Sequence, residues 1–311
     1  MHAKDLCYTT CMRALSYLEY LLVAGLWWLY RVVPIRWAYG IGRGVGVGMF
    51  ALFRWTRRAR TAIDNVLIAG LAKTRHEAYV IARDSLGHFA GHVCEALRIS
   101  DVVTRKTWEK YVTLTMSPAA KDLIFNPKGP IILATGHLGA WEAGTTAITS
   151  ARPLFAVARL MDNPYVQRFL ERHNFRGGVT IIPKRNGFSG SAMHRWQDQN
   201  AALVILFDQY CSHGVKVPFF GHTLNVYTSP ARLHLHTGAP IVVGGFVRKG
   251  HLQYEMVVIG EPIYPKPGAS LESVTADLVS RLEEVIRRAP DQYLWLHRRF
   301  RGIPVPQVPE R

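Results

Sequence analysis

Short apolar runs recur through the second half of the chain, and segments of helical length separate them. The runs cover residues 131–135 (IILAT), 154–159 (LFAVAR), 179–183 (VTIIP), 201–208 (AALVILFD), 240–248 (PIVVGGFVR) and 252–260 (LQYEMVVIG). Strands that alternate with helices are typical of an α/β sheet with a parallel core. A further helix is predicted over residues 271–288, and helices also over 61–115. The pattern therefore predicts an α/β domain whose mixed or mainly parallel sheet is flanked by helices.

The N-terminal part has a different pattern. Residues 14–34 are apolar except for Glu19 and Arg31. The unbroken apolar stretch, 20–30, is about half of the roughly 20 residues that a bilayer-spanning helix needs. Two tryptophans and a tyrosine cluster at its end, as in an interfacial aromatic belt. We expect an uncleaved membrane anchor that either crosses or lies in the bilayer; the alternative is a buried amphipathic helix of the folded domain.

Glycines follow at every fourth position within residues 35–53: Gly40, Gly44 and Gly48. Such small residues on one helix face predict close helix contact. Four arginines come directly afterwards, within residues 54–60, and would suit an anionic membrane surface. We therefore divide the chain into an anchor with a basic juxtamembrane segment (1–60) and a catalytic domain (61–311).

Charge narrows the choice of partner. The chain has 38 Lys and Arg against 22 Asp and Glu, a formal net charge of +16. An excess of this size predicts a polyanionic partner: a membrane surface, an acidic carrier or headgroup, or a nucleic acid. No zinc-finger, helix-turn-helix or RNA-binding pattern is present, so we expect no nucleic-acid partner. The four cysteines form no Cys-x-x-Cys pair, which favours a reducing compartment.

Chemically useful side chains gather at the ends of the predicted strands. His137, Arg159, Lys184 and Asp208 each lie at or just after the end of one apolar run. In open α/β sheets the ligand site lies at the carboxyl ends of the strands. The four residues are therefore predicted to belong to one site.

His137 is the strongest catalytic candidate. It follows a buried run within GHLGAWE, and Glu142 lies five residues further on. A histidine with an orienting carboxylate is the usual form of a general base. The two side chains could meet only if His137 precedes the helix, because five helical residues turn them about 140° apart. Gly136 and Gly139 allow such a turn, and the N–H groups nearby, including that of Gly139, are candidates to hold an oxyanion. The alternative is a chance spacing on a loop.

Other patterns leave two interpretations open. His88 and His92 share a helix face near Glu95. They could bind a metal, but the set lacks His-Glu-x-x-His spacing, so we expect packing and no metal. The basic stretch 160–195 is either a phosphate-docking surface or a solvated helix face. Phe219 and Phe220 either cover an acyl-chain groove or belong to the core.

Five blocks, in order, resemble the bacterial lipid A late acyltransferases and the related enzymes that acylate phosphatidylinositol mannosides. The blocks are GHLGAWE (136–142), RLMDNP (159–164), FDQ (207–209), PFFG (218–221) with TGAP (237–240), and PDQYLWLHRR (290–299). The likeness extends from about residue 15 to 303. It implies a glycerolipid-acyltransferase-like α/β fold with an N-terminal membrane-anchoring helical segment.

The resemblance also implies a function. His137 and Glu142 would form the general-base dyad, with substrate or oxyanion contacts from Gly139, Arg159, Asp162, Asn163, Asp208 and Gln209. Lys184, which is predicted from its place after a strand, would join these contacts. The donor would be a thioester of acyl carrier protein or coenzyme A, and the acceptor an anionic membrane glycolipid such as a lipid A precursor. No cofactor is implied. The enzyme would act at the cytoplasmic face of a bacterial inner membrane. Alternatives are acylation of a lysophospholipid or ornithine lipid, and a non-enzymatic basic membrane-surface or nucleic-acid-binding protein.

Overall fold

The computed structural model describes residues 3–158, 160–174, 179–183 and 190–311. The described part of the chain begins with four helices, α1 to α4, and continues as an α/β part that contains the strands. The helices are α1 (Ala3–Val32), α2 (Ile35–Leu52), α3 (Arg57–Ile68), α4 (Arg75–Ile99), α5 (Pro118–Phe125), α6 (Trp141–Ala151), α7 (Pro164–Asn174), α8 (Gly190–Asp198), α9 (Ser229–Thr237) and α10 (Leu271–Arg288), with 3-10 turns η1 (Trp108–Lys110) and η3 (Pro290–Gln292). The strands are β1 (Val112–Thr115), β2 (Ile131–Thr135), β3 (Leu154–Ala158), β4 (Val179–Pro183), β5 (Ala202–Leu206), β6 (Val215–Phe219), β7 (His222–Val226), β8 (Ile241–Gly250) and β9 (Gln253–Val258).

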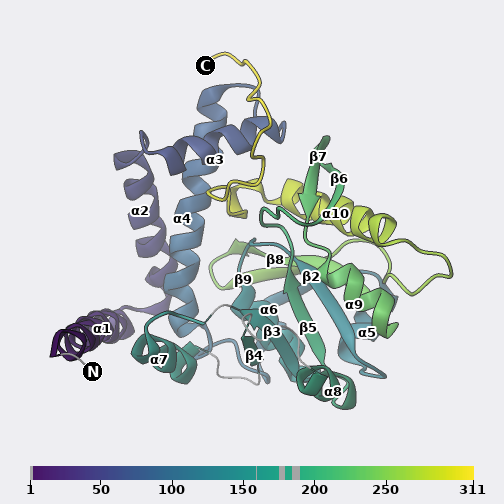
Figure 1. Ribbon diagram of the computed structural model, residues 1–311, viewed down its shortest axis with the longest axis horizontal. Coiled ribbons are helices and arrows are strands. Elements are labelled where there is room, and N and C mark those ends of the chain that lie inside the picture. Colours follow the sequence, from purple (N-terminus) through teal and green to yellow (C-terminus); the bar gives the residue numbers. More distant parts are fainter. Residues whose placement is uncertain (1–2, 159, 175–178, 184–189) are drawn as a thin grey trace.

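A seven-stranded sheet in the order β1-β9-β8-β2-β5-β3-β4 forms the centre of the α/β part (Figure 1). All neighbouring strands are parallel except β8 and β9, which form an antiparallel pair. The predicted α/β fold with a mainly parallel sheet is therefore confirmed. The middle strands β2 and β5 are almost continuously apolar and buried, as expected for strands covered on both faces.

The side chains of the central strands alternate between two apolar cores. Ile132, Ala134, Leu203 and Ile205 pack with helices α8, α9 and α10. Leu133 and Val204 point the other way, toward α5 and α6. This is the period of two that a pleated strand imposes. Helix α10 buries residues spaced three or four apart along its sequence, the stripe of an amphipathic helix.

The sequence patterns missed three strands. β1 lies in a segment that we predicted as helical, but its residues, VTLT, are mostly β-branched, and they pair with β9 at the edge of the sheet. The hairpin β6–β7 lies in a segment rich in loop residues. Phe219 and Phe220 at its turn are buried against Phe300, so the prediction that they cover an acyl-chain groove is wrong and the core alternative holds.

Helices α2 and α4 pack side by side beside the sheet (Figure 1). Their contact uses glycines other than those predicted. A Cβ atom on Gly42 or Gly46 would come within 2.6 Å of a carbonyl oxygen of α4, whereas Gly40, Gly44 and Gly48 face open space. The expected close approach of helices is thus present, but on the neighbouring face of α2.

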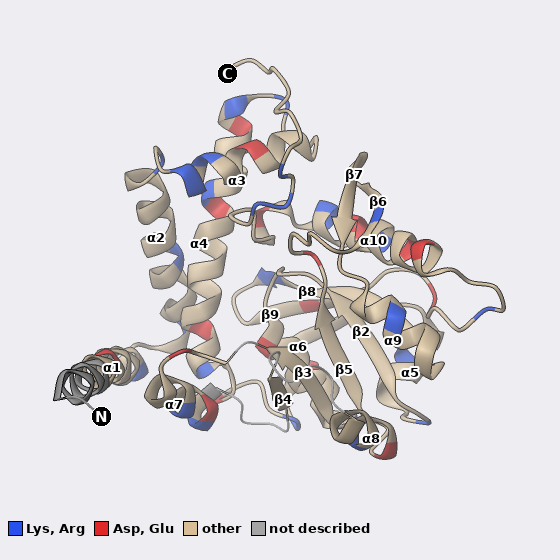
Figure 2. Ribbon diagram, in the orientation of Figure 1, with Lys and Arg blue, Asp and Glu red and all other residues tan. Residues whose placement is uncertain are grey.

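Helices α1 and α2 leave many large apolar side chains in contact with solvent. Leu22, Leu26 and Leu29 of α1 and Val45 and Leu52 of α2 are among the most exposed. Figure 2 shows few charged residues along α2 and basic residues where α3 begins. Within the described residues, none of the helices has both the length and the apolar character required to cross a bilayer.

Candidate active site

His137 lies directly after β2, at the carboxyl edge of the sheet. Its Nδ1 atom is 2.8 Å from Oδ1 of Asp208, which follows β5, the neighbour of β2. The other oxygen of the same carboxylate, Oδ2, accepts the backbone N–H of His137 at 2.9 Å. The side chain of Asp208 is 3% exposed and that of His137 is 23% exposed. Asp208 therefore fixes both the backbone and the imidazole ring of His137.

The pairing lowers the pKa of Asp208 and fixes the tautomer of His137. Burial alone would raise the pKa of Asp208, but the hydrogen bond from the His137 ring, its charge and the backbone N–H outweigh burial, and the pKa is lowered. A carboxylate that accepts from Nδ1–H leaves the lone pair on Nε2. Nε2 lies 3.2 Å from the side-chain nitrogen of Gln209, which can donate to it. His137 is thus arranged to accept a proton at Nε2.

The spacing in the sequence predicted Glu142 as the partner of His137, and this prediction is wrong: the partner in the structure is Asp208. Glu142 lies on the first turn of α6, and its Oε2 is 2.7 Å from Nε2 of His92 on α4. Trp141 stands edge to face with both histidine rings, at centroid distances of 5.6 Å from His92 and 5.9 Å from His137. The five-residue spacing therefore brings Glu142 next to the turn that carries His137 without bringing it to the imidazole of His137.

The His92–Glu142 pair belongs to a buried polar cluster between α4 and the sheet. Burial would lower the pKa of His92, but the charges of Glu142 and Glu95 raise it; burial would raise the pKa of Glu142, but His92 lowers it. Burial and the nearby His92 lower the pKa of His88 to about 3. Glu95 binds Arg248 through both of its oxygens, each at 3.2 Å. His88 Nδ1 lies 3.0 Å from the hydroxyl of Tyr39 on α2, so both histidines have partners within the packed protein. Among the described residues no group of three or more His, Cys, Asp and Glu that could hold a metal is found.

We expect His92→Gln to lower the free energy of unfolding by about 3 kcal/mol, because the substitution leaves a largely buried Glu142 charge without its partner. The His92 contribution is complete below pH 6.5 and is lost as pH rises through its raised pKa. The Glu142 contribution is complete above pH 4.5 and is lost as pH falls through its lowered pKa. Urea unfolding across this range should therefore show the largest difference between variant and parent from pH 4.5 to 6.5. A difference independent of pH would contradict the ion pair, and His92→Gln with Glu142→Gln should cost less than the two single changes together.

The backbone of the turn after β2 is held by two distant segments. Gly139 N–H donates to the Gln292 carbonyl at 3.1 Å, and Ala140 N–H donates to the Phe246 carbonyl at 2.7 Å. The Leu294 N–H donates to the His137 carbonyl at 3.0 Å. Because its N–H is already bonded, Gly139 is not free to hold an oxyanion as we predicted. Its role is to permit the turn.

Gly139→Ala is expected to destabilise the fold by about 3 kcal/mol, through backbone strain and overlap. Gly139 has φ +75°, and a Cβ atom there would lie 1.6 Å from the carbonyl oxygen of Phe246. Gly48→Ala is the matched control, because no atom lies within 4 Å of a Cβ at that helical position. Thermal unfolding of both variants measures the difference, and equal melting temperatures would contradict the assigned role of Gly139.

The C-terminal block 290–299 surrounds Asp208 and Gln209. Burial, followed by the neighbouring Asp208 carboxylate, raises the pKa of Tyr293 well above its ordinary value. Arg299 is 3% exposed, and its guanidinium donates to the Asn225 carbonyl at 2.7 Å and to the Gln209 carbonyl at 3.5 Å. Asn65 of α3 donates to the carbonyls of Trp295 and His297. Arg299 thus holds the backbone of Gln209, and Asn65 ties block 290–299 to α3.

The remaining predicted site residues are scattered. Asn163 begins α7: its Oδ1 accepts the N–H of Tyr165 at 2.9 Å, and its Nδ2 donates to Glu19 of α1 at 2.9 Å. It therefore ties α7 to α1. Asp162 precedes it on an exposed turn. Arg159 and Lys184 lie outside the described residues. The structure brings together His137, Asp208 and Gln209.

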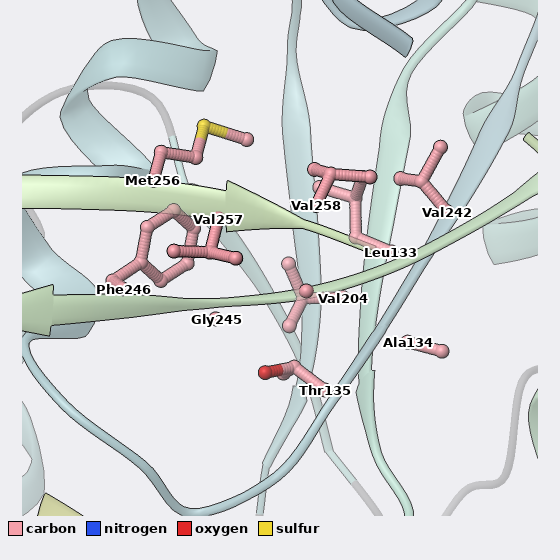
Figure 3. Close-up of a pocket in the computed structure, with 11 residues that line it drawn as sticks. Leu133, Ala134, Thr135, Val204, Val242, Gly245, Phe246, Met256, Val257 and Val258 are labelled. Carbon is pink, nitrogen blue, oxygen red and sulfur yellow. The ribbon is translucent and has the colours of Figure 1, made fainter. Parts of the chain in front are cut away.

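Two cavities border this region. The smaller one, of about 20 Å³, lies between β2, β5, β8 and β9 and is lined by apolar side chains, with Thr135 contributing the only side-chain oxygen (Figure 3). It has room for little more than one water molecule. The larger one, of about 1190 Å³, is lined by His137, Gln209 and many apolar residues. Of these two cavities, the larger one has room for a substrate beside the imidazole of His137.

The model of the family described as "Bacterial lipid A biosynthesis acyltransferase" matches residues 8–302. The chain belongs to this family. The acyltransferase is also similar to a phosphatidylinositol mannoside acyltransferase from Mycolicibacterium smegmatis, with 25% identity over 256 residues that cover 80% of each chain. Among solved structures, the 1-acyl-sn-glycerophosphate acyltransferase PlsC from Thermotoga maritima matches 75% of this acyltransferase and 95% of its own chain, at 15% identity and a TM-score of 0.33.

Proposed function

We propose that this acyltransferase moves a fatty acyl group from a thioester of acyl carrier protein or coenzyme A to a hydroxyl of a membrane glycolipid such as a lipid A precursor. The observation that carries the proposal is the His137–Asp208 pair, which borders a cavity of about 1190 Å³. Pockets for a single drug-sized ligand measure about 300–1,000 Å³. A cavity above that range, lined largely by apolar side chains, suits long acyl chains.

The chemistry follows from the free lone pair of His137. Nε2 takes the proton of the acceptor hydroxyl while its oxygen attacks the thioester carbonyl. The tetrahedral intermediate then breaks its C–S bond, and the departing sulfur takes the proton back from the imidazolium. Asp208 holds the ring and stabilises its positive charge between these two steps. The acceptor hydroxyl displaces the Gln209 side chain from Nε2, so that Gln209 is then free to bind the acceptor.

The developing oxyanion requires hydrogen-bond donors beside the carbonyl carbon. Helix α6 begins one residue after Ala140, which provides no side-chain cap for its first turn. The amide groups at the start of a helix are suited to an anion. They are the donors that we propose here in place of Gly139. Glu142 then acts through His92, by fixing Trp141 and the start of α6 next to His137.

The apolar side chains on α1 and α2 support a location at a bacterial inner membrane, on its cytoplasmic face. An exposed apolar face followed by arginines suits a helix pair lying in the interface of an anionic leaflet. The four arginines Arg54, Arg57, Arg58 and Arg60 come directly after α2.

Transfer of radiolabelled acyl groups tests the proposal. Acyl carrier protein and coenzyme A thioesters are each offered with a panel of glycolipids, lysophospholipids and ornithine lipids in vesicles. Label in a glycolipid would support the proposal and identify donor and acceptor together. Label only in a lysophospholipid or ornithine lipid would replace the proposed acceptor, and an absence of label in every lipid would refute the proposed reaction.

A further inference from the structure

The large cavity extends to both faces of the sheet. Leu203 and Ile205 line it and belong to the core beneath α8–α10, whereas Val204 and Leu206 also line it and pack with the α6 core. Neighbouring residues of one strand point to opposite faces of a sheet. A cavity that contacts both sets must therefore pass through the sheet.

The passage lies where β3 and β5 part. These strands pair only from Leu154↔Ala202 to Ala156↔Val204. β3 remains paired with β4 as far as Ala158, and β5 with β2 as far as Leu206. The unpaired ends, Val157–Ala158 and Ile205–Leu206, all line the cavity. The passage is thus a slot between two neighbouring strands, at the sheet edge that carries His137.

The two sides of the slot differ in chemistry. The side beneath α6, which we call the α6 lobe, is lined by apolar groups such as Phe89, Ile99 and Phe246 and, along α6 itself, by Glu142, Thr145 and Thr146; among the described lining residues it has no Lys, Arg or unpaired histidine. The other side, the α9 lobe, is lined by four polar groups. They are Tyr227, Ser229, Arg232 and His236.

Arg232 and His236 are four residues apart on α9 and so lie on one helix face. Neither the guanidinium of Arg232 nor the imidazole of His236 has an ion pair or hydrogen bond with any residue that the structure describes. Both side chains are exposed and reach the lining of the α9 lobe, where two donor groups beside two hydroxyls suit a phosphate group.

We propose that the α9 lobe binds the phosphate end of the donor's phosphopantetheine arm, while the acyl chain occupies the α6 lobe and the thioester lies in the slot beside His137. The proposal rests on the acyl-transfer function argued above. A phosphopantetheine thioester is a single unbranched chain with a fatty end and a phosphate end, and it fits a slot between two strands. A glycolipid with sugar rings and several acyl chains is branched, so it is a poorer match for a passage between two neighbouring strands. Acyl carrier protein and coenzyme A carry the same arm.

Three donors with the same acyl chain test the assignment: the acyl carrier protein thioester, the coenzyme A thioester, and the N-acetylcysteamine thioester, which lacks the phosphate. Arg232→Ala should reduce the preference in kcat/KM for the phosphate-bearing donors over N-acetylcysteamine by about 10-fold to 100-fold. Arg232→Lys should retain most of that preference, because it keeps the charge. Lys121→Ala, on the exposed part of α5 away from the cavity, removes the same charge and should leave the preference unchanged.

The outcomes separate this assignment from the proposed reaction. If Arg232→Ala lowers kcat/KM equally for all three donors, or raises the KM of the acceptor instead, the α9 lobe does not bind the donor's phosphate. If only one of the phosphate-bearing donors loses its preference, that donor is the one the lobe accepts. Equilibrium binding of a nonreactive S-alkyl coenzyme A provides a second readout without turnover, and an affinity unchanged by Arg232→Ala would also overturn the assignment.

Discussion

His137→Ala is expected to lower the rate of acyl transfer by about 10²-fold to 10⁴-fold, the range that a positioned general base contributes. A hydroxyl is a weak nucleophile at neutral pH unless a base takes its proton. The base that we propose is Nε2 of His137, because Asp208 engages Nδ1 and Asp208 itself is buried. The measurement is the initial rate of labelled glycolipid formation at saturating donor.

His251→Ala provides the matched control for this prediction. His251 lies on the exposed turn between β8 and β9, outside the large cavity. Its removal takes away an imidazole without touching the site. A rate for His137→Ala that equals the rate for His251→Ala would remove His137 from the mechanism, provided that both variants unfold at the temperature of the parent.

Asp208→Asn is expected to reduce kcat by about 10²-fold or more, with a smaller change in KM. The two carboxylate oxygens of Asp208 accept from two donors, the His137 ring and the His137 backbone N–H. An asparagine has one oxygen and one NH₂ group, so one of these donors would face another donor. Either the backbone of the turn is released, or the ring must place its proton on Nε2, where it can no longer accept one.

Glu142→Gln is the contrast that decides which carboxylate orients the base. Glutamine keeps the volume of Glu142 and removes only its charge, which faces His92. We expect the loss in kcat to be at least 10-fold smaller than for Asp208→Asn, because Glu142 acts on His137 only through Trp141. The opposite order of effects would restore the pairing of His137 with Glu142 that its sequence spacing indicates.

The sequence was informative about features that depend only on residues close together in the chain. Uninterrupted apolar runs identified six strands of the sheet, and the shared position of His137 and Asp208 at strand ends placed them in one site. The sheet order decides which carboxylate meets His137, and the order depends on contacts between distant strands. β2 and β5 are neighbours although two other strands, β3 and β4, lie between them in the sequence. The five-residue spacing between His137 and Glu142 therefore could not identify the partner of His137, which follows the neighbouring strand.

The sequence did not reveal the partner of Glu142 either, because this contact also joins residues that are far apart in the chain. His92 lies about 50 residues earlier, on a helix whose packing against the sheet no periodicity reveals. The glycine stripe of α2 was misassigned because two interleaved sets of glycines, Gly40, Gly44 and Gly48 and then Gly42 and Gly46, both repeat every four residues. Only the direction from which α4 approaches distinguishes them.

The support of the His137 turn by block 290–299 has a consequence for biosynthesis. Ser85 donates a hydrogen bond to the carbonyl of Tyr293, 208 residues away. The turn that carries His137 is held only once Gln292 and Leu294 have formed their hydrogen bonds to it. Ribosomes add about 5–20 residues per second, so the imidazole emerges many seconds before the segment that orients it. Helices α1 and α2 are synthesised first and can bind a lipid surface early. At that stage the imidazole of His137 is not yet held in position. Acyl transfer by the proposed base therefore begins only after block 290–299 has been translated and has packed against the turn.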